Sequence, residues 1–220
     1  DRTSRGLGDV YKRQVVTNPL DQMTTLVSQV SGLPKNKVIG QAGVLDTSRF
    51  AYFISEKLNV NMNEIEALTL GSHGETMVPV PSQCRVAGKP LNDLLSDDEI
   101  SELVQKTSDG GAEIVGLLKT GSAYFAPSSA AAIMVKSILS DSNEIMPACS
   151  WVNGEYGIND VFLGVPTMLG SSGVTKVVEI ELKSNELSAL KSASEAVKSK
   201  VDELDSILSC LLYTSDAADD

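Results

Sequence analysis

The spacing of apolar residues changes near Leu45, and this change limits the folds that are open to the chain. Before Leu45 the pattern predicts a strand over 15–17, a helix capped by Asp21, and a short buried strand over 37–41. The expected apolar face of this helix consists of Met23, Leu26, Val27 and Val30. A strand, a helix and a strand in this order are typical of a parallel α/β sheet, so we expect 15–45 to be the tail of one.

From residue 46 to residue 209 the pattern is that of a mixed α+β unit. It predicts helices over 47–58, 96–119, 123–140 and 184–204, and strands over 65–70, 77–80, 146–152, 161–165 and 174–182. Gly110 and Gly111 favour a break or kink in the second helix. The last helix carries the clearest apolar stripe, which we expect to pack into the core: Leu187, Leu190, Ala193, Val197, Val201 and Leu204.

The two ends of the chain are related to one another at the level of DNA. Asp9–Gln14 and Cys210–Ser215 can be encoded by reverse complements of one DNA element. Inverted copies of an element around an open reading frame are typical of transposon-type sequencing adapters that have been translated. We therefore expect 1–14 and 210–220 to be adapter-like, non-native segments, and 15–209 to be a fragment of a longer protein.

The composition excludes several classes of protein. With 220 residues, 42% of them hydrophobic, the chain can build a sizeable core. A net charge of −11 without a basic stripe argues against nucleic acid as a partner, and no apolar run reaches the ~20 residues that span a membrane. Three cysteines without a CxxC pair, beside one histidine, predict no metal site and no disulfide framework. We expect Cys84 and Cys149 to serve packing, and the cytoplasm to be the compartment.

Three polar residues, His73, Asp46 and Arg49, supply the groups that a 2-oxo acid requires, and Asn18 precedes them in the chain. His73 is the only histidine and can give up and recover a proton near neutral pH. Asp46 could orient its imidazole, and the planar guanidinium of Arg49 could grip a carboxylate through two parallel hydrogen bonds. Each residue also has an ordinary structural role. His73 could be a turn residue, Asp46 a helix N-cap, Arg49 the partner of Asp46 or Glu56 in a surface ion pair, and Asn18 the end of a strand.

Three segments match, in order and spacing, the NP-[LV]-D, LD-x-x-RF and G-x-HG motifs of a known family: Asn18-Pro19-Leu20-Asp21, Leu45-Asp46-Thr47-Ser48-Arg49-Phe50 and Gly71-Ser72-His73-Gly74. In these motifs the chain resembles the malate and lactate dehydrogenase family, over nearly all of 15–209. The resemblance implies that 15–45 is the remnant of a Rossmann-type NAD-binding domain. It implies that 46–209 is the mixed α+β catalytic and substrate-binding domain of that fold.

The resemblance also implies a reaction, the reversible NAD-dependent oxidation of (S)-malate to oxaloacetate. His73 would be the proton donor and acceptor, Asp46 its partner, and Arg49 the clamp on the substrate carboxylate. Asn18 would hydrogen-bond the substrate oxygen beside the nicotinamide. Thr17, Asn18 and His73 would be the cofactor-binding residues in this chain, because the main NAD site of the family lies upstream. The full-length enzyme would be a homodimer or homotetramer.

Malate is favoured over lactate by the segment 121–127, GSAYFAP, which looks like the malate branch of the family. Lactate enzymes typically carry a threonine where Ala123 stands, and the smaller side chain would leave room for a second carboxylate. The loop that selects the substrate most directly lies upstream of Val15 in the family. A lactate or other 2-hydroxyacid dehydrogenase is therefore an alternative, and we expect the fragment alone to be inactive.

Two further alternatives belong to other classes of protein. A hydrolase would use His73 as a base, but the chain contains no GxSxG elbow. A non-catalytic binding domain would give no reason to keep Asp46, Arg49 and His73 together. The complete set of three residues favours an enzyme.

Overall fold

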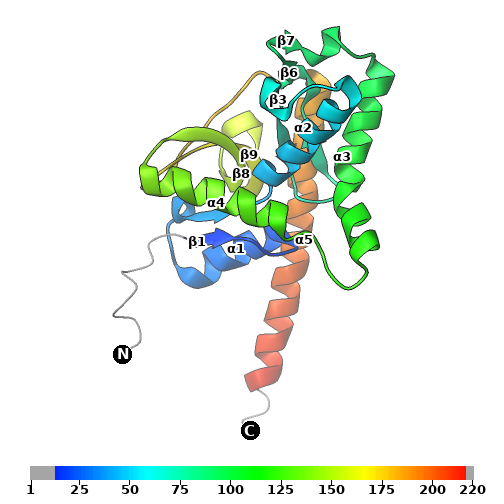
Figure 1. Cartoon of the computed structure of the whole chain (residues 1–220). Helices are drawn as coiled ribbons and strands as arrows, with labels where there is room; N and C mark the ends of the chain where they lie inside the picture. Colours follow the sequence, from blue (N-terminus) through cyan, green and yellow to red (C-terminus); the bar gives the residue numbers. More distant parts are fainter. Residues whose placement is uncertain (1–12, 217–220) are drawn as a thin grey trace.

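The computed structural model describes residues 13–216, and Figure 1 shows their arrangement. The α-helices are α1 (Leu20–Ser31), α2 (Gly43–Leu58), α3 (Asp97–Leu118), α4 (Phe125–Ser140) and α5 (Ser184–Asp216). The strands are β1 (Arg13–Val15), β2 (Val38–Gly40), β3 (Ile65–Glu66), β4 (Thr69–Gly71), β5 (Met77–Pro79), β6 (Arg85–Val86), β7 (Lys89–Pro90), β8 (Glu144–Val152), β9 (Val161–Gly170) and β10 (Gly173–Val177). Single 3-10 turns are η1 (Lys35–Lys37), η2 (Met62–Glu64), η3 (Pro81–Gln83), η4 (Leu91–Asp93) and η5 (Glu155–Gly157).

Within residues 13–216 the main sheet has seven strands in the order β1-β2-β8-β9-β4-β5, with β10 paired to β9. The β1–β2 pair is parallel, whereas the pairs formed by β8, β9, β4, β5 and β10 are antiparallel. The expected fold class, α/β followed by α+β, is confirmed. The change near Leu45 does not interrupt the sheet, because Gly40 of β2 pairs with Cys149 of β8.

A second sheet of three short strands, β3-β6-β7, lies beside α2 and α3. The predicted strand over 65–70 is therefore two strands in two sheets, with β3 in the small sheet and β4 in the main one. The interior of this part is filled by side chains from α2, α3 and the loops around β6, among them Phe50, Ile54, Leu91 and Leu103, each at most 2% exposed. This packing holds α2 in place, and α2 carries Asp46 and Arg49.

The long helix α5 runs the length of the molecule in Figure 1, from beside α2 to below α1. Its predicted stripe is confirmed as core packing, since Leu190, Ala193 and Val197 are buried against β4, β5 and β9. The Glu186 carboxylate accepts hydrogen bonds from the Ser82 backbone and hydroxyl and from the Lys183 backbone, which ties the start of α5 to η3. The predicted strand over 174–182 ends earlier, at Val177.

Helix α1 differs from its sequence prediction. The residues that it buries are Leu20, Asp21, Thr24, Thr25 and Ser28, whereas Val30 of the expected apolar face is 74% exposed. Thr24 and Thr25 can be buried because their hydroxyls donate to the carbonyls of Leu20 and Asp21 in the preceding turn. Asp21 does not cap the helix, which begins at Leu20 after Pro19.

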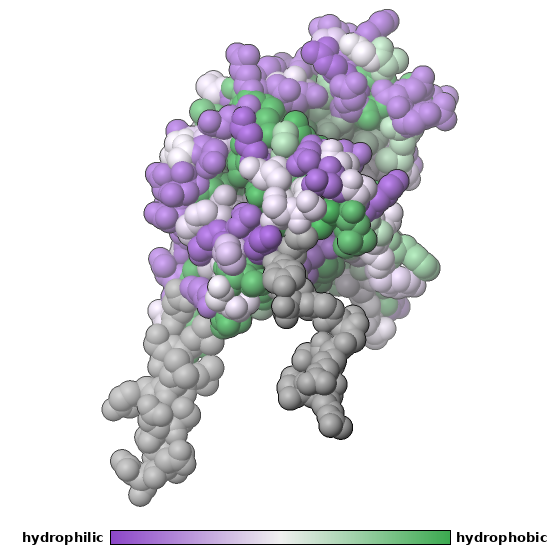
Figure 2. Space-filling view, turned by 90° about the vertical axis from the view of Figure 1, so that its left-hand side faces the viewer, coloured by the Kyte–Doolittle hydropathy of each residue, from purple (hydrophilic) through white to green (hydrophobic). Residues whose placement is uncertain are grey.

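Two helices on the outside of the molecule also depart from expectation. Helix α3 continues through Gly110 and Gly111 without the predicted break. Helix α4 begins at Phe125 rather than at 123, and it buries Ala130, Met134 and Ser137. Phe125 and Leu139 are 82% and 80% exposed. Figure 2 shows hydrophobic and hydrophilic residues interspersed on one face of the molecule.

The expected adapter-like segments lie largely outside the described residues. Arg13 and Gln14 pair with β2, and the last residues of α5 belong to the expected segment 210–220. Strand β1 thus begins two residues before the predicted strand over 15–17 and shares only Val15 with it. Backbone groups of almost any sequence can form a β ladder, so the pairing of β1 does not show whether 1–14 is native. The origin of 1–14 and 210–220 stays a prediction, and so do the domain boundaries at 45 and 209. No helix among the described residues is long and apolar enough to cross a membrane.

Candidate active site

His73 lies in the turn between β4 and β5, and the backbone around this turn has little freedom. Gly71, at the end of β4, has a φ of +82°, a conformation that favours glycine. A Cβ on Gly71 would come within 2.8 Å of the Thr76 carbonyl oxygen. From the neighbouring strand β9, Gly164 pairs with Gly71, and a Cβ on Gly164 would collide with the Gly71 carbonyl oxygen. Two glycines therefore allow β4 and β9 to approach at the base of the His73 turn.

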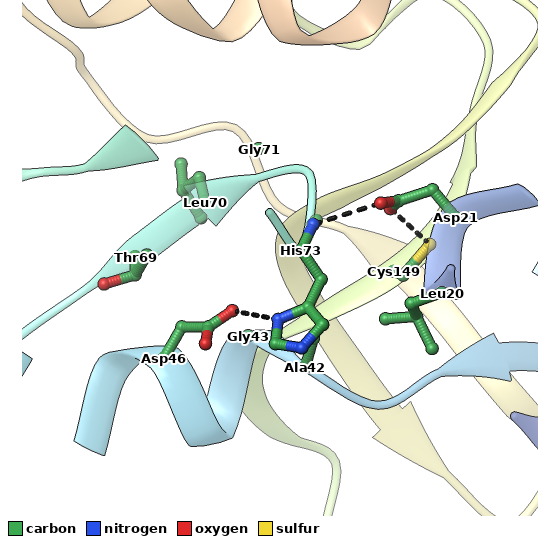
Figure 3. Close-up of a pocket in the computed structure, with 11 residues that line it drawn as sticks. Leu20, Asp21, Ala42, Gly43, Asp46, Thr69, Leu70, Gly71, His73 and Cys149 are labelled. Atoms are coloured by element: carbon green, nitrogen blue, oxygen red, sulfur yellow. Dashed lines mark hydrogen bonds and ion pairs between the residues drawn. The ribbon is translucent and has the colours of Figure 1, made fainter. Parts of the chain in front are cut away.

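The Asp46 carboxylate joins His73 and Arg49. Its Oδ2 atom lies 2.9 Å from Nδ1 of His73 (Figure 3). Its Oδ1 atom accepts a hydrogen bond from Nη1 of Arg49 at 3.2 Å. The Asp46 side chain is 3% exposed, those of His73 and Arg49 18% and 14%. Asp46 is not the N-cap of a helix over 47–58, because α2 begins at Gly43 and the Asp46 N–H donates to Ala42. The structure thus brings together three of the predicted residues.

This arrangement favours the protonated form of His73. Burial lowers the pKa of the imidazole, but the hydrogen bond and the negative charge of Asp46 outweigh burial, and the net result is a raised pKa. The positive charge of Arg49 opposes this rise, and the carboxylate of Asp21 adds to it. Within the described residues no group hydrogen-bonds Nε2 of the ring. Nε2 is therefore the nitrogen that can exchange a proton with a bound molecule.

Two residues at this site are absent from the functional residues that the sequence predicts. Asp21 of α1 accepts a hydrogen bond from the backbone N–H of His73 at 3.0 Å, and the Cys149 thiol of β8 donates to its other oxygen at 3.3 Å (Figure 3). The NPLD segment does contain Asp21, but its place before an apolar stripe favours a helix cap. Cys149 gives no such signal, because only the fold brings β8 against α1.

The space behind these side chains is small. It is lined by Asp21, Asp46, His73 and Cys149 together with backbone of β4, and its volume is about 10 Å³. This is room for about one water molecule. A molecule with two carboxylates is too large to enter it.

The remaining predicted site residues are not joined to His73 by a hydrogen bond or ion pair of the described side chains. Thr17 and Asn18 are exposed, just beyond the carboxyl end of β1. Ala123 is half-buried in the loop between α3 and α4. Among the described residues no three histidine, cysteine, aspartate or glutamate side chains are grouped so that they could hold a metal ion. The roles of Thr17, Asn18 and Ala123 stay predictions.

Known proteins share both the sequence and the fold. The malate dehydrogenase of Staphylococcus carnosus is 50% identical over 184 residues, which are 84% of this chain and 59% of that protein. The solved malate dehydrogenase of Salinibacter ruber is 44% identical with a TM-score of 0.87, covering 90% of this chain and 65% of that one. The solved lactate dehydrogenase of Cryptosporidium parvum, complexed with lactic acid and nicotinamide adenine dinucleotide, is 38% identical with a TM-score of 0.85, covering 87% and 62%. The chain thus spans about three fifths of the length of such relatives.

The family match includes the residues that the site brings together. Residues 43–207 match the family described as lactate/malate dehydrogenase, alpha/beta C-terminal domain, and this range contains Asp46, Arg49 and His73. The fold and the relatives agree with this match. The chain therefore belongs to the lactate/malate dehydrogenase family.

Proposed function

We propose that this chain is the catalytic part of an NAD-dependent malate dehydrogenase, which interconverts (S)-malate and oxaloacetate. The observation that carries the proposal is the buried carboxylate of Asp46, which holds Nδ1 of His73 at 2.9 Å and leaves Nε2 for a substrate. An imidazole fixed in this way can act as a general base in one direction and a general acid in the other.

In malate oxidation, Nε2 of His73 takes the proton of the C2 hydroxyl. The electron pair of the broken O–H bond becomes the second bond between C2 and its oxygen, which gives the ketone of oxaloacetate. NAD, when bound, accepts the hydride that leaves C2. Asp46 stabilises the imidazolium that results, because its negative charge lies in direct contact with the ring. In the reverse direction His73 returns the proton to the ketone oxygen.

Arg49 is proposed as the clamp on the carboxylate beside C2. One of its nitrogens binds Asp46, which fixes the guanidinium plane and leaves donors on the other nitrogens. Gly110 and Gly111 of α3 lie against the Arg49 side chain, and a Cβ on Gly111 would be 3.5 Å from Nη1. A Cβ at either position would make only ordinary van der Waals contact, so α3 lies beside the Arg49 side chain without a clash. Ala123 is proposed to leave room for the second carboxylate.

The residues present fit the nicotinamide end of NAD. Ligands of parallel α/β sheets bind beyond the carboxyl ends of the strands. Thr17 and Asn18 lie exposed at this end of β1, which pairs in parallel with β2. Asn18 is proposed to hydrogen-bond the substrate oxygen, with Thr17 and His73 beside the cofactor. The phosphate-binding part is proposed to lie in the rest of the protein, so the 220-residue chain alone is proposed to be inactive.

Substrate, assembly and compartment belong to the same proposal. Malate is preferred to lactate because of Ala123 and because the Staphylococcus carnosus relative, at 50% identity, is a malate dehydrogenase. A lactate dehydrogenase is the second candidate, since the Cryptosporidium parvum structure is similar over 87% of the chain. A homodimer or homotetramer is supported by apolar side chains that are exposed in this chain, such as Leu117 and Phe125. The cytoplasm is proposed from the cysteine pattern alone.

The proposal is tested by restoring the missing part. Residues 15–209 replace the corresponding segment of the Staphylococcus carnosus malate dehydrogenase, and NADH oxidation is followed with oxaloacetate or pyruvate. The proposal requires turnover of oxaloacetate by the hybrid, whose specificity loop comes from the Staphylococcus carnosus enzyme. A folded, NADH-binding hybrid without turnover of either substrate would contradict a catalytic role.

A further inference from the structure

Asp21 is an acid in an unusual position. It lies in the first turn of α1, 3% exposed, and no lysine or arginine of the described chain forms an ion pair with it. A buried carboxylate without a cation is costly unless other groups stabilise it. Its two hydrogen-bond donors are the backbone N–H of His73 and the thiol of Cys149. Each donor binds a different oxygen of the Asp21 carboxylate, so Asp21 connects α1, the His73 turn and β8.

Asp21 and Asp46 hold different parts of the same residue. Asp46 binds the ring of His73 from α2, whereas Asp21 binds the main chain of His73 from α1 (Figure 3). The next residues of the turn, Gly74 and Glu75, are exposed and do not attach its main chain to the interior. A hydroxyl pair between Ser72 and Thr76 at 2.6 Å closes the turn locally but does not attach it to the sheet interior. The bond to Asp21 therefore attaches the turn to the interior at His73.

We propose that Asp21 is a positioning residue for His73, which fixes the main chain of the turn and stabilises the protonated imidazole by its charge. This inference rests on the proposed function only for the reaction in which the proton on His73 takes part, and not for the contacts of Asp21. The charged groups that face His73 are Asp46 and Arg49 from α2 and Asp21 from α1. The titratable group that faces Asp21 from β8 is the Cys149 thiol, whose pKa is raised by complete burial and by Asp21 itself. Cys149 therefore stays protonated and serves as a donor.

The single histidine makes the test direct, because the imidazole signal of His73 in a proton NMR spectrum has no competitor. The full 220-residue chain is titrated as wild type, Asp21→Asn, Asp46→Asn and Glu75→Gln. Glu75 is the matched control, since it is an exposed acid two residues from His73 in sequence. We expect Asp21→Asn to lower the titration midpoint of His73, Asp46→Asn to lower it further, and Glu75→Gln to change it least. If the titration midpoint of His73 were the same in Asp21→Asn as in Glu75→Gln, the charge of Asp21 would not stabilise the protonated imidazole, and that half of the proposal would be overturned.

The main-chain part is measured by hydrogen exchange at the His73 amide. Asparagine keeps an oxygen that can accept this N–H, whereas alanine does not. Asp21→Ala should therefore accelerate exchange of the amide by about fivefold relative to Asp21→Asn, as the loss of a hydrogen bond between neutral groups implies. Equal exchange in the two variants would show that the bond does not hold the turn.

A measurement on the unchanged chain covers the case in which the variants fold poorly. Burial raises the pKa of Asp21, against the bonds from His73 and Cys149, so its titration is displaced above that of an ordinary aspartate. The chemical shift of the His73 amide should follow this acidic step, because the amide is bound to the titrating carboxylate. The absence of an acidic step in that shift would contradict the proposal. None of these measurements needs turnover, so the role of Asp21 can fail while the dehydrogenase activity stands, and the reverse.

Discussion

Asp46 Oδ2 lies 2.9 Å from His73 Nδ1, although 27 positions separate the two residues in sequence. The contact forms because α2 is packed against β4, which leads directly into the His73 turn. The Thr47 hydroxyl, next to Asp46, accepts a hydrogen bond from the Thr69 backbone at 2.9 Å and fixes α2 to β4. The geometry of the Asp46–His73 pair is therefore set by how α2 packs on β4.

The substitution Asp46→Asn tests the charge of this pair without removing its shape. The amide oxygen of the new side chain can still accept a hydrogen bond from Nδ1 but carries no negative charge, so the imidazolium is less stable. In the hybrid enzyme we expect kcat to fall by about 10²-fold or more. A loss below threefold would mean that Asp46 is only structural.

The raised pKa of His73 predicts opposite pH profiles for the two directions of the reaction. Malate oxidation needs the neutral imidazole, so kcat/KM should fall as the pH drops below the pKa of His73. Oxaloacetate reduction needs the protonated form, so kcat/KM should fall as the pH rises above it. Both inflections should lie above 6.5, the ordinary value for histidine. Inflections at or below that value would contradict the effect of Asp46.

The raised pKa of His73 also predicts how the stability of the fold depends on pH. The pKa of His73 is higher in the folded chain than its ordinary value, so its protonated form stabilises the fold. This contribution is fully present below the unfolded pKa of about 6.5 and is lost as the pH rises through the folded pKa. Urea unfolding of the chain at several pH values, with His73→Asn as the reference, should show a difference that shrinks toward alkaline pH.

Gly164→Ala tests the close approach of β9 to β4. The added Cβ would collide with the Gly71 carbonyl oxygen, so a strand must shift next to the His73 turn. We expect a loss of about 1–3 kcal/mol in the free energy of unfolding. Gly116→Ala is the control, because its Cβ would meet no atom within 4 Å in the helix α3. That substitution should instead stabilise the chain by about 0.5–1 kcal/mol.

Two acids on α5 should differ in their effect on stability. Glu186 is 6% exposed and accepts hydrogen bonds from Ser82 and Lys183, whereas the Glu195 side chain is 71% exposed and pairs with Lys198. Glu186→Ala removes three hydrogen bonds to a buried carboxylate and should cost about 2–3 kcal/mol. Glu195→Ala should cost at most about 1 kcal/mol. If the two variants unfolded at the same urea concentration, the hydrogen bonds between α5 and η3 would not stabilise the fold.

The sequence is informative where the physical signal is local or where several motifs agree in spacing. Periodicity predicts the stripe of α5, and the motifs predict the grouping of Asp46, Arg49 and His73. The prediction for the buried face of α1 is right for Met23 and Val27, which pack against the core, and wrong for Val30, which is exposed. Thr24 and Thr25 are buried instead, because they satisfy their hydroxyls within the helix. For Asp21 the sequence predicts only a local role as a cap. Its partner, His73, lies 52 positions away, and only the assembled sheet brings them together.

The most direct test of the account is the rate of oxaloacetate-dependent NADH oxidation by the hybrid enzyme with His73→Asn, compared with Glu75→Gln. We expect His73→Asn to lower kcat by about 10²–10⁴-fold, because the proposed proton donor is lost, while the hybrid still binds NADH. Glu75→Gln should retain nearly full activity, because Glu75 is exposed and has no part in the reaction. A His73→Asn enzyme as active as its parent would remove His73 from the mechanism and contradict the central claim.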